Sequence, residues 1–293
     1  MTRGELEKAL GRALEDPSLR VLGIHPAGGG CIHSASRIAT TAGDFFAKWN
    51  DDCPDDAFLR EADGLRELAA TGSDLAVPRV LDAQPPSARV PAFILMEYLP
   101  PATQEVSGHD EALGRGLAAI HRRTAPSYGF DTDTYCGPTR QDNTRSRSWV
   151  EFYGERRLRP LVGLLESKRA LPATERKTYD RLIERLSSLV PEGAPPSLIH
   201  GDLWSGNVMR SARGPAVFDP ACAYSDREME FGITTLFGGF AARFWSAYEE
   251  AWPLPEGWHE RNPLYQLYHL LNHFLIFGGH YGREAIAIAK RFA

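Results

Sequence analysis

The chain has 293 residues, and its 33 basic and 38 acidic side chains give a formal charge of −5. This length allows one large or two medium domains, and the acidic balance argues against nucleic acid as the main partner. Four cysteines without a CxxC pair or zinc-ligand spacing predict free thiols in a reducing, cytoplasmic compartment. No run of about 18 apolar residues occurs, so we expect no membrane partner.

A four-residue leucine repeat opens the chain and predicts a short helix that ends before Pro17. Residues 21–49 then alternate β-like runs with turn residues, which is typical of three antiparallel strands. The turn between the first two strands consists of Gly28, Gly29, Gly30 and Cys31. Because glycine permits close approach of backbone N–H groups, the turn is predicted to cover nucleotide phosphates; a plain hairpin turn is the alternative. No Walker A sequence is present, which disfavours P-loop chemistry.

Lys48 lies at the end of the third strand, and residues 58–71 downstream have a helical period. A solvated surface lysine is one interpretation of Lys48, and an ion pair with an acid of this helix is the other. Glu61 and Glu67 are the two candidate partners, and their six-residue separation does not place them on one helix face. We predict Glu61, because a residue in the first half of the helix can face the sheet.

Cys31 lies in this glycine turn, and a separate hypothesis is that oxidation of its thiol inhibits nucleotide binding. A phosphate-covering turn must open to admit nucleotide, so its thiol would be accessible, and Lys48 would favour the reactive thiolate. Oxidation, including a disulfide between two copies of the chain, would then slow phosphate entry. The alternative is an unreactive residue that fills the turn.

Two further strands are predicted at residues 77–83 and 91–97, and the prolines after them end the sheet. We predict the domain boundary here, with residues 1–99 as the nucleotide-binding lobe and 100–293 as the catalytic and substrate-binding lobe. In a two-lobed kinase, the backbone of Glu97, Tyr98 and Leu99 would form the hydrogen bonds to adenine.

Helical periods dominate after His109, and His121 at the end of the first of these helices is expected to contact neighbouring backbone. Residues 128–149 show neither helical nor strand pattern, and a loop of this length is expected to face a polar substrate. Helices are predicted at residues 111–124, 149–167, 175–190, 226–252 and 263–279. The late histidines do not follow an HExxH pattern, so we expect core or solvated positions for His269, His273 and His280 rather than a metal site.

The stretch SLIHGDLWSGN, residues 197–207, contains the chemistry-bearing pattern of the chain. Asp202 is followed five residues later by Asn207, and a second acid, Asp219, closes the apolar run AVFD. Phosphoryl transfer needs a carboxylate to orient the attacking hydroxyl, together with an amide and a second carboxylate to hold Mg²⁺. The order H-x-D-x4-N followed by Asp therefore indicates a kinase catalytic loop, and the alternative is an ordinary turn between strands.

IHGDLWSGN, FDPACAYSDRE and YQLYHLLNHFLIFGG together resemble the fructosamine kinase (ketosamine-3-kinase) family, and the likeness extends over residues 28–279. HGD with a following Asn alone would also fit aminoglycoside and choline kinases. The resemblance implies an α+β, bilobal protein-kinase-like fold, with a small antiparallel-sheet N-lobe holding one main helix and a larger helical C-lobe. It also implies an ATP-dependent phosphotransferase that acts on the 3-hydroxyl of a ketosamine and has a deglycation role.

By resemblance, Asp202 is the catalytic base, Asn207 and Asp219 are magnesium ligands, and Lys48 with Glu61 anchors the phosphates. Trp204 matches a tryptophan that faces the sugar, where an indole attracts a cationic ketosamine nitrogen; core packing is the alternative.

The family resemblance also implies supporting residues. His200 lies beside the catalytic acid. Related kinases usually have an Asp near Glu230 that steadies the catalytic-loop backbone, so here we expect Asp226 or a repacked Glu230 to share that role.

The leading hypothesis is a ketosamine kinase that uses ATP and Mg²⁺. Its acceptor would be a small-molecule ketosamine or a glycated protein lysine, and the chain would be a monomer or homodimer. Another small-molecule kinase of the aminoglycoside or choline kinase type is the alternative enzyme. A nucleotide-binding pseudokinase is the alternative class, although intact Asp202, Asn207, Asp219 and Lys48 argue against it.

Overall fold

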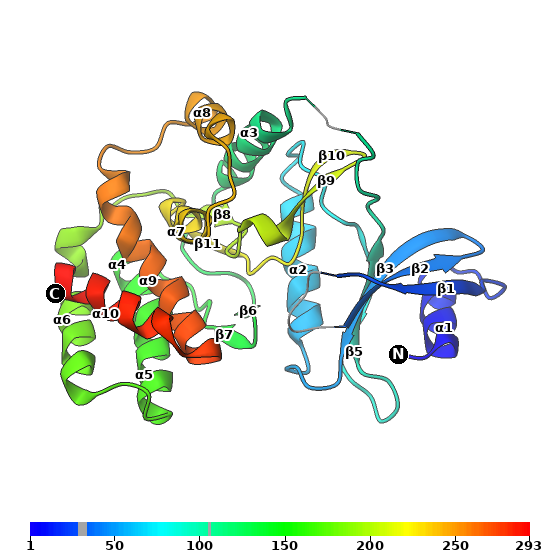
Figure 1. Cartoon of the computed structure of the whole chain (residues 1–293), viewed down its shortest axis with the longest axis horizontal. Helices are drawn as coiled ribbons and strands as arrows, with labels where there is room; N and C mark the ends of the chain where they lie inside the picture. The colour runs from blue at the N-terminus through cyan, green and yellow to red at the C-terminus, as the bar shows by residue number, and fades with distance from the viewer. Residues whose placement is uncertain (29–33, 105–106) are drawn as a thin grey trace.

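The structure is a computed structural model of the chain, and it describes residues 1–28, 34–104 and 107–293. Figure 1 shows two lobes side by side, an N-terminal lobe built around a sheet and a mainly helical C-terminal lobe. The expected α+β arrangement is confirmed. Within the three described ranges, no helix is both long and apolar enough to cross a membrane.

The N-terminal lobe is a five-stranded antiparallel sheet with one helix on each face. Its elements are α1 (Arg3–Ala13), β1 (Val21–Pro26), β2 (Ser34–Thr40), β3 (Gly43–Asn50), α2 (Ala57–Ala69), β4 (Val80–Gln84) and β5 (Ala92–Glu97). The strand order is β1-β2-β3-β5-β4. The predicted first helix, the three strands of residues 21–49 and the two later strands are therefore confirmed.

Strand β5 is apolar along its length because both faces of the sheet are covered. Successive side chains of a strand point to opposite faces. Phe93 and Leu95 pack in the cluster that includes Leu6 of α1, whereas Ile94 and Met96 pack in the cluster that includes Phe58 of α2. Helix α2 consequently lies between the sheet and the C-terminal lobe (Figure 1).

The C-terminal lobe contains helices and three two-stranded sheets. Its first elements are α3 (His109–His121), β6 (Thr134–Cys136), β7 (Thr139–Gln141), α4 (Trp149–Glu151), the π-helix η1 (Phe152–Leu158), α5 (Arg159–Ser167), α6 (Ala173–Leu189) and β8 (Ser197–Ile199). They are followed by the 3₁₀ turn η2 (Ser205–Asn207), β9 (Val208–Ser211), β10 (Gly214–Val217), β11 (Ala223–Ser225), α7 (Glu228–Leu236), α8 (Ala242–Ala251), α9 (Trp258–Phe277) and α10 (His280–Phe292).

Two expectations about this lobe were wrong. The segment 128–149 is not without strands, because β6 and β7 pair as a short hairpin, and the Gln141 side chain donates to the Tyr268 hydroxyl at 2.7 Å. Three-residue strands are too short to show an alternating pattern. The helix expected over residues 226–252 is two helices, because Gly238 and Gly239 adopt positive φ values of 64° and 92° between them.

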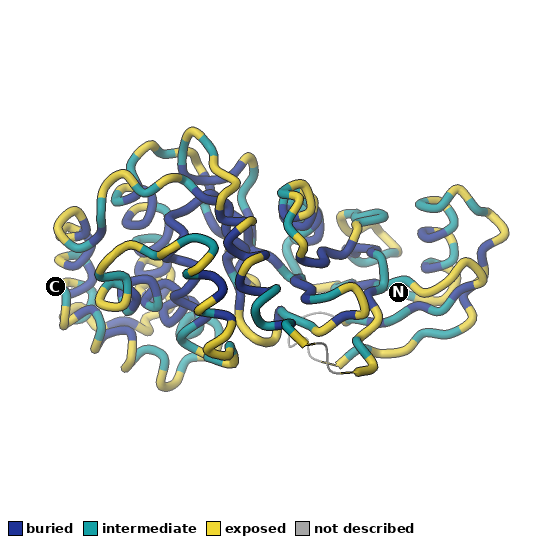
Figure 2. The backbone as a smooth tube through the Cα atoms, turned by 90° about the horizontal axis from the view of Figure 1, so that it is seen from above, coloured by how far each residue is buried: buried dark blue, intermediate teal, exposed yellow. Residues whose placement is uncertain are grey.

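Buried aromatic residues fix α9 in the middle of the C-terminal lobe. Trp149 Nε1 donates to the Tyr265 hydroxyl at 3.1 Å, and the Trp149 ring stacks on Tyr153 with centroids 5.4 Å apart. Figure 2 shows the buried backbone concentrated inside this lobe, with exposed segments around it. Helix α7 packs directly on α9, so the two helices support the loop between β8 and β9 from behind.

Candidate active site

The loop between β8 and β9 carries Asp202, and its backbone conformation depends on glycine. Gly201 has a φ of +82°, and a Cβ at this position would lie 2.2 Å from the carbonyl oxygen of Ala221. An L side chain is therefore excluded both by φ and by space. The 3₁₀ turn η2 then brings Asn207 back to Asp202.

Asn207 holds Asp202 in place. Its Nδ2 donates to the backbone oxygen of Asp202 at 2.8 Å and to its carboxylate Oδ2 at 3.1 Å. Burial, reinforced by the nearby charge of Asp219, raises the pKa of the Asp202 carboxyl well above its usual range. Because both hydrogen bonds use Nδ2, the Oδ1 oxygen of Asn207 is left to face a ligand.

Lys48 joins the two lobes. Its Nζ lies 2.8 Å from Oε1 of Glu61 on α2 and also pairs with Oδ1 of Asp219 from the C-terminal lobe. Burial opposes the charge, yet the two carboxylates raise the pKa of Lys48 above its usual value, so the amine is cationic. The alternative partner, Glu67, instead accepts a hydrogen bond from the Tyr224 hydroxyl at 2.6 Å.

Asp219 has a strained backbone, because its φ is +60°, in the left-handed region that residues with a Cβ seldom adopt. Such strain persists only where the surroundings enforce it, and it is concentrated at functional sites. The side chain of Asp219 is 38% exposed, so a carboxylate oxygen remains accessible from the cleft.

Glu230 steadies the loop from behind. It accepts hydrogen bonds from the backbone N–H of His200 at 2.5 Å and of Gly201 at 3.0 Å. Asp226 does not share this role: its carboxylate accepts from the Tyr265 hydroxyl and from the N–H of Glu228. Of the two expected residues, Glu230 contacts the loop backbone and Asp226 does not, because the longer Glu230 side chain reaches the loop by itself.

The histidines near this loop are neutral and structural. The N–H of Asp202 donates to Nδ1 of His200 at 3.3 Å, so its Nε2 carries the proton and donates to the Phe218 carbonyl at 3.0 Å. Burial lowers the pKa of His200 below its usual value. His121 contacts side chains rather than the expected backbone, since its Nδ1 lies 2.8 Å from the Tyr248 hydroxyl.

Trp204 lies at the mouth of the site. Its side chain is 36% exposed, and its indole contacts Phe237 edge to face with centroids 6.2 Å apart. A Cβ on residue 206 would lie 2.2 Å from the indole, so Gly206 allows the ring to fold across the loop. The exposed fraction separates Trp204 from the core tryptophan Trp149, which is 1% exposed.

The residues expected to bind nucleotide elsewhere are only partly described. Gly29, Gly30 and Cys31 lie outside the described residues, and Gly28 is the last residue before them, where it is exposed. In the segment between the lobes, Glu97 pairs with Arg213, Tyr98 lies under Arg37, and Leu99 is buried against Ala76 and Ala216. The side chains of these three residues therefore already have partners within the protein.

Sequence reasoning missed two neighbours of Asp202. Cys136 at the end of β6 and His269 on α9 each place a ligand atom within 4.8 Å of the other and of an Asp202 carboxylate oxygen. Burial raises the pKa of the Cys136 thiol and lowers the pKa of His269 to about 3. No spacing could have signalled this group, because tertiary packing alone brings the three segments together.

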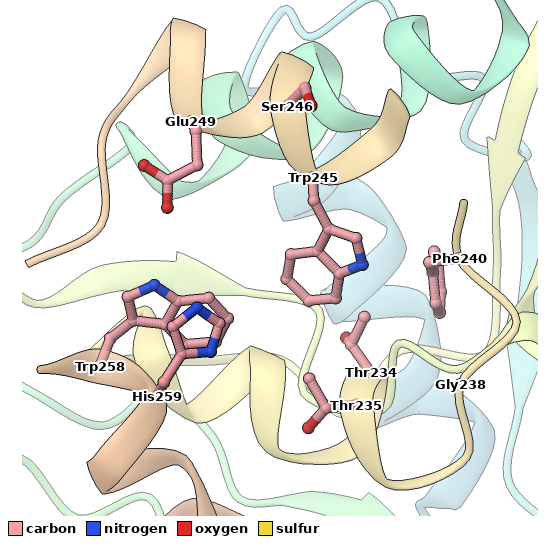
Figure 3. A pocket seen from close by; sticks show the side chains of 9 residues that line it. All are labelled: Thr234, Thr235, Gly238, Phe240, Trp245, Ser246, Glu249, Trp258 and His259. Carbon is pink, nitrogen blue, oxygen red and sulfur yellow. The ribbon is translucent and has the colours of Figure 1, made fainter. Parts of the chain in front are cut away.

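A separate pocket of about 570 Å³ lies behind the loop. Figure 3 shows Trp245 between Phe240 and the stacked pair Trp258 and His259. The pocket is lined by Thr234, Thr235, Gly238, Phe240, Trp245, Ser246, Glu249, Trp258 and His259. Thr234 donates to the Leu203 carbonyl at 2.9 Å, so this wall supports the catalytic loop without opening onto Asp202.

Comparisons with known proteins agree with this geometry. The family model described as fructosamine kinase matches residues 6–292. A protein-ribulosamine 3-kinase, chloroplastic, of Oryza sativa subsp. indica is 38% identical, with 94% of this chain and 80% of that protein covered. A probable ketoamine kinase of Enterococcus faecium is 36% identical, with 92% and 95% covered.

Solved structures extend the likeness to the fold. A crystal structure from Thermobifida fusca that carries a fructosamine-3-kinase name has a TM-score of 0.85 and 32% identity, covering 97% of this chain and 98% of that one. An aminoglycoside phosphotransferase in complex with AMP-PNP and hygromycin B has a TM-score of 0.62 at 17% identity, with 99% of each chain covered. The predicted kinase-like, two-lobed fold is confirmed, and the chain belongs to the fructosamine kinase family.

Proposed function

We propose that the protein is an ATP-dependent kinase that phosphorylates the 3-hydroxyl of a ketosamine, either a small glycated amine or a glycated protein lysine. The observation that carries the proposal is the convergence of Asp202, Asn207, Asp219 and the Lys48–Glu61 pair on one cleft. Family membership and the names of the relatives, which include ketoamine and ribulosamine kinases, support the acceptor class.

In this proposal Asp202 is the general base. Its carboxylate accepts the proton of the acceptor hydroxyl while that oxygen attacks the γ-phosphorus of ATP and the bond to the β-phosphate oxygen breaks. The bonds from Asn207 keep the carboxylate oriented toward the cleft. Glu230 fixes the backbone of the loop that carries the base. Phosphorylation of this hydroxyl would serve deglycation.

Lys48 and Asp219 would hold the nucleotide. Lys48 is cationic and already positioned by Glu61, so its Nζ would pair with phosphate oxygens in the way Asp219 now pairs with it. The Asp219 carboxylate and the Asn207 amide oxygen form a hard oxygen donor set that fits Mg²⁺. When bound there, the ion would neutralise charge that develops on the phosphates.

Trp204 would bind the acceptor. Its exposed indole lies two residues from Asp202 in the chain, and an aromatic face suits both the C–H groups of a sugar and a cationic ketosamine nitrogen. We further propose that backbone groups of residues 97–99 bind adenine, that residues 1–99 act as the nucleotide lobe, and that residues 100–293 act as the catalytic lobe.

A substrate panel tests the proposal. Purified protein is incubated with ATP and Mg²⁺ in the presence of fructosamine-type and ribulosamine-type ketosamines, free sugars or aminoglycosides, and ADP release is measured. Ketosamine-dependent ADP release that is lost in Asp202→Asn supports the proposal. Release with aminoglycosides but not ketosamines would replace it with the alternative small-molecule kinase.

A further inference from the structure

Three side chains from different parts of the fold converge at Asp202, in the loop between β8 and β9. The Sγ of Cys136, a carboxylate oxygen of Asp202 and a ring nitrogen of His269 all lie within 4.8 Å of one another. Cys136 and His269 are buried, with 3% and 1% of their surfaces exposed, whereas Asp202 is half-buried. The group is therefore open to the cleft only through Asp202.

One nitrogen of the buried imidazole of His269, Nδ1, lacks a hydrogen-bond partner among the described residues. A polar nitrogen left unsatisfied in the interior is destabilising, so such an atom calls for a ligand. The proposed mechanism gives no role to this nitrogen or to the Cys136 thiol.

The donor set selects the kind of ligand. Thiolate, imidazole and carboxylate together are the ligands of zinc-class cations, whereas Mg²⁺ prefers an all-oxygen set. Zinc with bonds of about 2.0–2.3 Å holds its ligand atoms roughly 3.3–3.8 Å apart in a tetrahedron. Because the three atoms lie within 4.8 Å of one another, they would need to close by at most about 1.0–1.5 Å to bind such an ion.

We propose that Cys136, Asp202 and His269 form a binding site for a zinc-class divalent cation and that the bound cation inhibits the enzyme. Binding forms bonds from Sγ, the ring nitrogen and the carboxylate oxygen to the ion, and the thiol proton leaves to solvent. The inhibitory consequence rests on the proposed kinase function, because the ion takes the oxygen that would accept the hydroxyl proton. The ion should therefore compete with the acceptor and not with ATP.

Cobalt binding tests the site without any activity. Co²⁺ alone is titrated into the protein, and thiolate-to-cobalt charge-transfer absorption is recorded. We expect saturation at one equivalent, displacement by Zn²⁺, loss of the charge-transfer band in Cys136→Ser and at least about tenfold weaker binding in His269→Gln. Cys53→Ser and His273→Gln are the matched controls, and they should bind cobalt like the parent.

A second measurement protects the test against variants that do not fold. In the parent protein, X-ray absorption of the bound zinc should show one sulfur ligand at about 2.3 Å together with nitrogen and oxygen ligands at about 2.0–2.2 Å. A cobalt spectrum unchanged in Cys136→Ser, or a zinc X-ray absorption spectrum without a sulfur ligand, would overturn the site. A His269→Gln variant with a raised KM for ketosamine and unchanged cobalt affinity would also overturn it and assign His269 to the acceptor.

Kinase assays separate this inference from the proposed function. Zinc should raise the apparent KM for ketosamine in the parent protein and have little effect in Cys136→Ser. Equal inhibition of both proteins would overturn the inhibitory role. If the protein binds cobalt through Cys136 but has no ketosamine kinase activity, the metal site stands and the proposed function is wrong.

Discussion

Trp204 is the residue whose exposure most clearly indicates a ligand. Unlike the buried Trp149, it is partly exposed, and it lies two residues from Asp202 in the chain. We expect Trp204→Ala to raise the KM for a ketosamine by roughly 2- to 30-fold, which corresponds to about 0.5–2 kcal/mol of ring and cation–π contact. Trp204→Phe keeps a ring and should recover part of the loss.

Steady-state kinetics with varied ketosamine and varied ATP measure this effect. The KM for ATP should stay unchanged in both variants, because the aromatic contact of the indole among the described residues is with Phe237 and not with the Lys48–Glu61 pair. If Trp204→Ala instead loses ATP affinity or unfolds, the indole packs the loop and the assignment to the acceptor is wrong.

His121 is one of the buried histidines that make the stability of the fold sensitive to pH. Burial lowers its pKa below the usual value of about 6.5, with Glu230, Tyr248 and Arg227 around it. Below that pH the unfolded chain binds a proton that the folded protein does not, so stability falls as pH falls from about 6.5 toward the folded pKa. His121→Gln should lose less stability over this range than the parent.

Urea unfolding at about pH 7.5 and about pH 5.5 tests the effect of His121. The control is His280→Gln, an exposed residue, which should follow the parent at both values. A variant at position 121 whose free energy of unfolding drops as steeply as that of the parent would show that another group titrates.

At the scale of elements, the π-helix η1 holds the segment that follows β7 through Arg157. Arg157 is 1% exposed. Its guanidinium donates to the Asp142 carbonyl at 2.7 Å and to Oδ1 of Asn143 at 2.5 Å. It also lies 4.5 Å from the centroid of the Phe152 ring. The single ammonium group of lysine cannot form both of these hydrogen bonds in the same planar geometry. Arg157→Lys should therefore reduce the free energy of unfolding by about 1–3 kcal/mol.

The neighbouring Arg156 provides the matched control. It forms a half-exposed ion pair with Asp142, and such pairs contribute about 0–1 kcal/mol. Chemical denaturation of Arg157→Lys and Arg156→Lys side by side compares the two positions. Equal losses of unfolding free energy in the two variants would mean that the hydrogen bonds of Arg157 do not order the segment.

Sequence patterns predicted elements where one period persists over several turns or residues. The helices α1, α2, α3 and α6 and the strands of the N-terminal sheet have such periods, whereas the three-residue strands β6 and β7 and the π-helix η1 do not. The Asp202–Asn207 contact was predictable because the motif is local. The approach of Cys136 and His269 to Asp202 was not, because it depends on how β6 and α9 pack.

At the scale of the whole molecule, Asp219 connects the lobes through its ion pair with Lys48. If it also holds Mg²⁺, Asp219→Ala should weaken nucleotide binding in the presence of magnesium more than in its absence. Calorimetry with ATP, with and without Mg²⁺, measures the difference. An equal loss under both conditions would mean that Asp219 acts only through Lys48.

The central claim is that Asp202 directs phosphate from ATP to the 3-hydroxyl of a ketosamine. The most direct test is ³¹P–¹H correlation NMR of a ketosamine incubated with ATP, Mg²⁺ and either the parent protein or Asp202→Asn. With the parent protein, we expect a phosphomonoester whose phosphorus couples to the proton at carbon 3 of the ketosamine. We also expect a rate about 10²- to 10⁴-fold lower with the variant. Phosphate at another position, or equal rates for the two proteins, would contradict the claim.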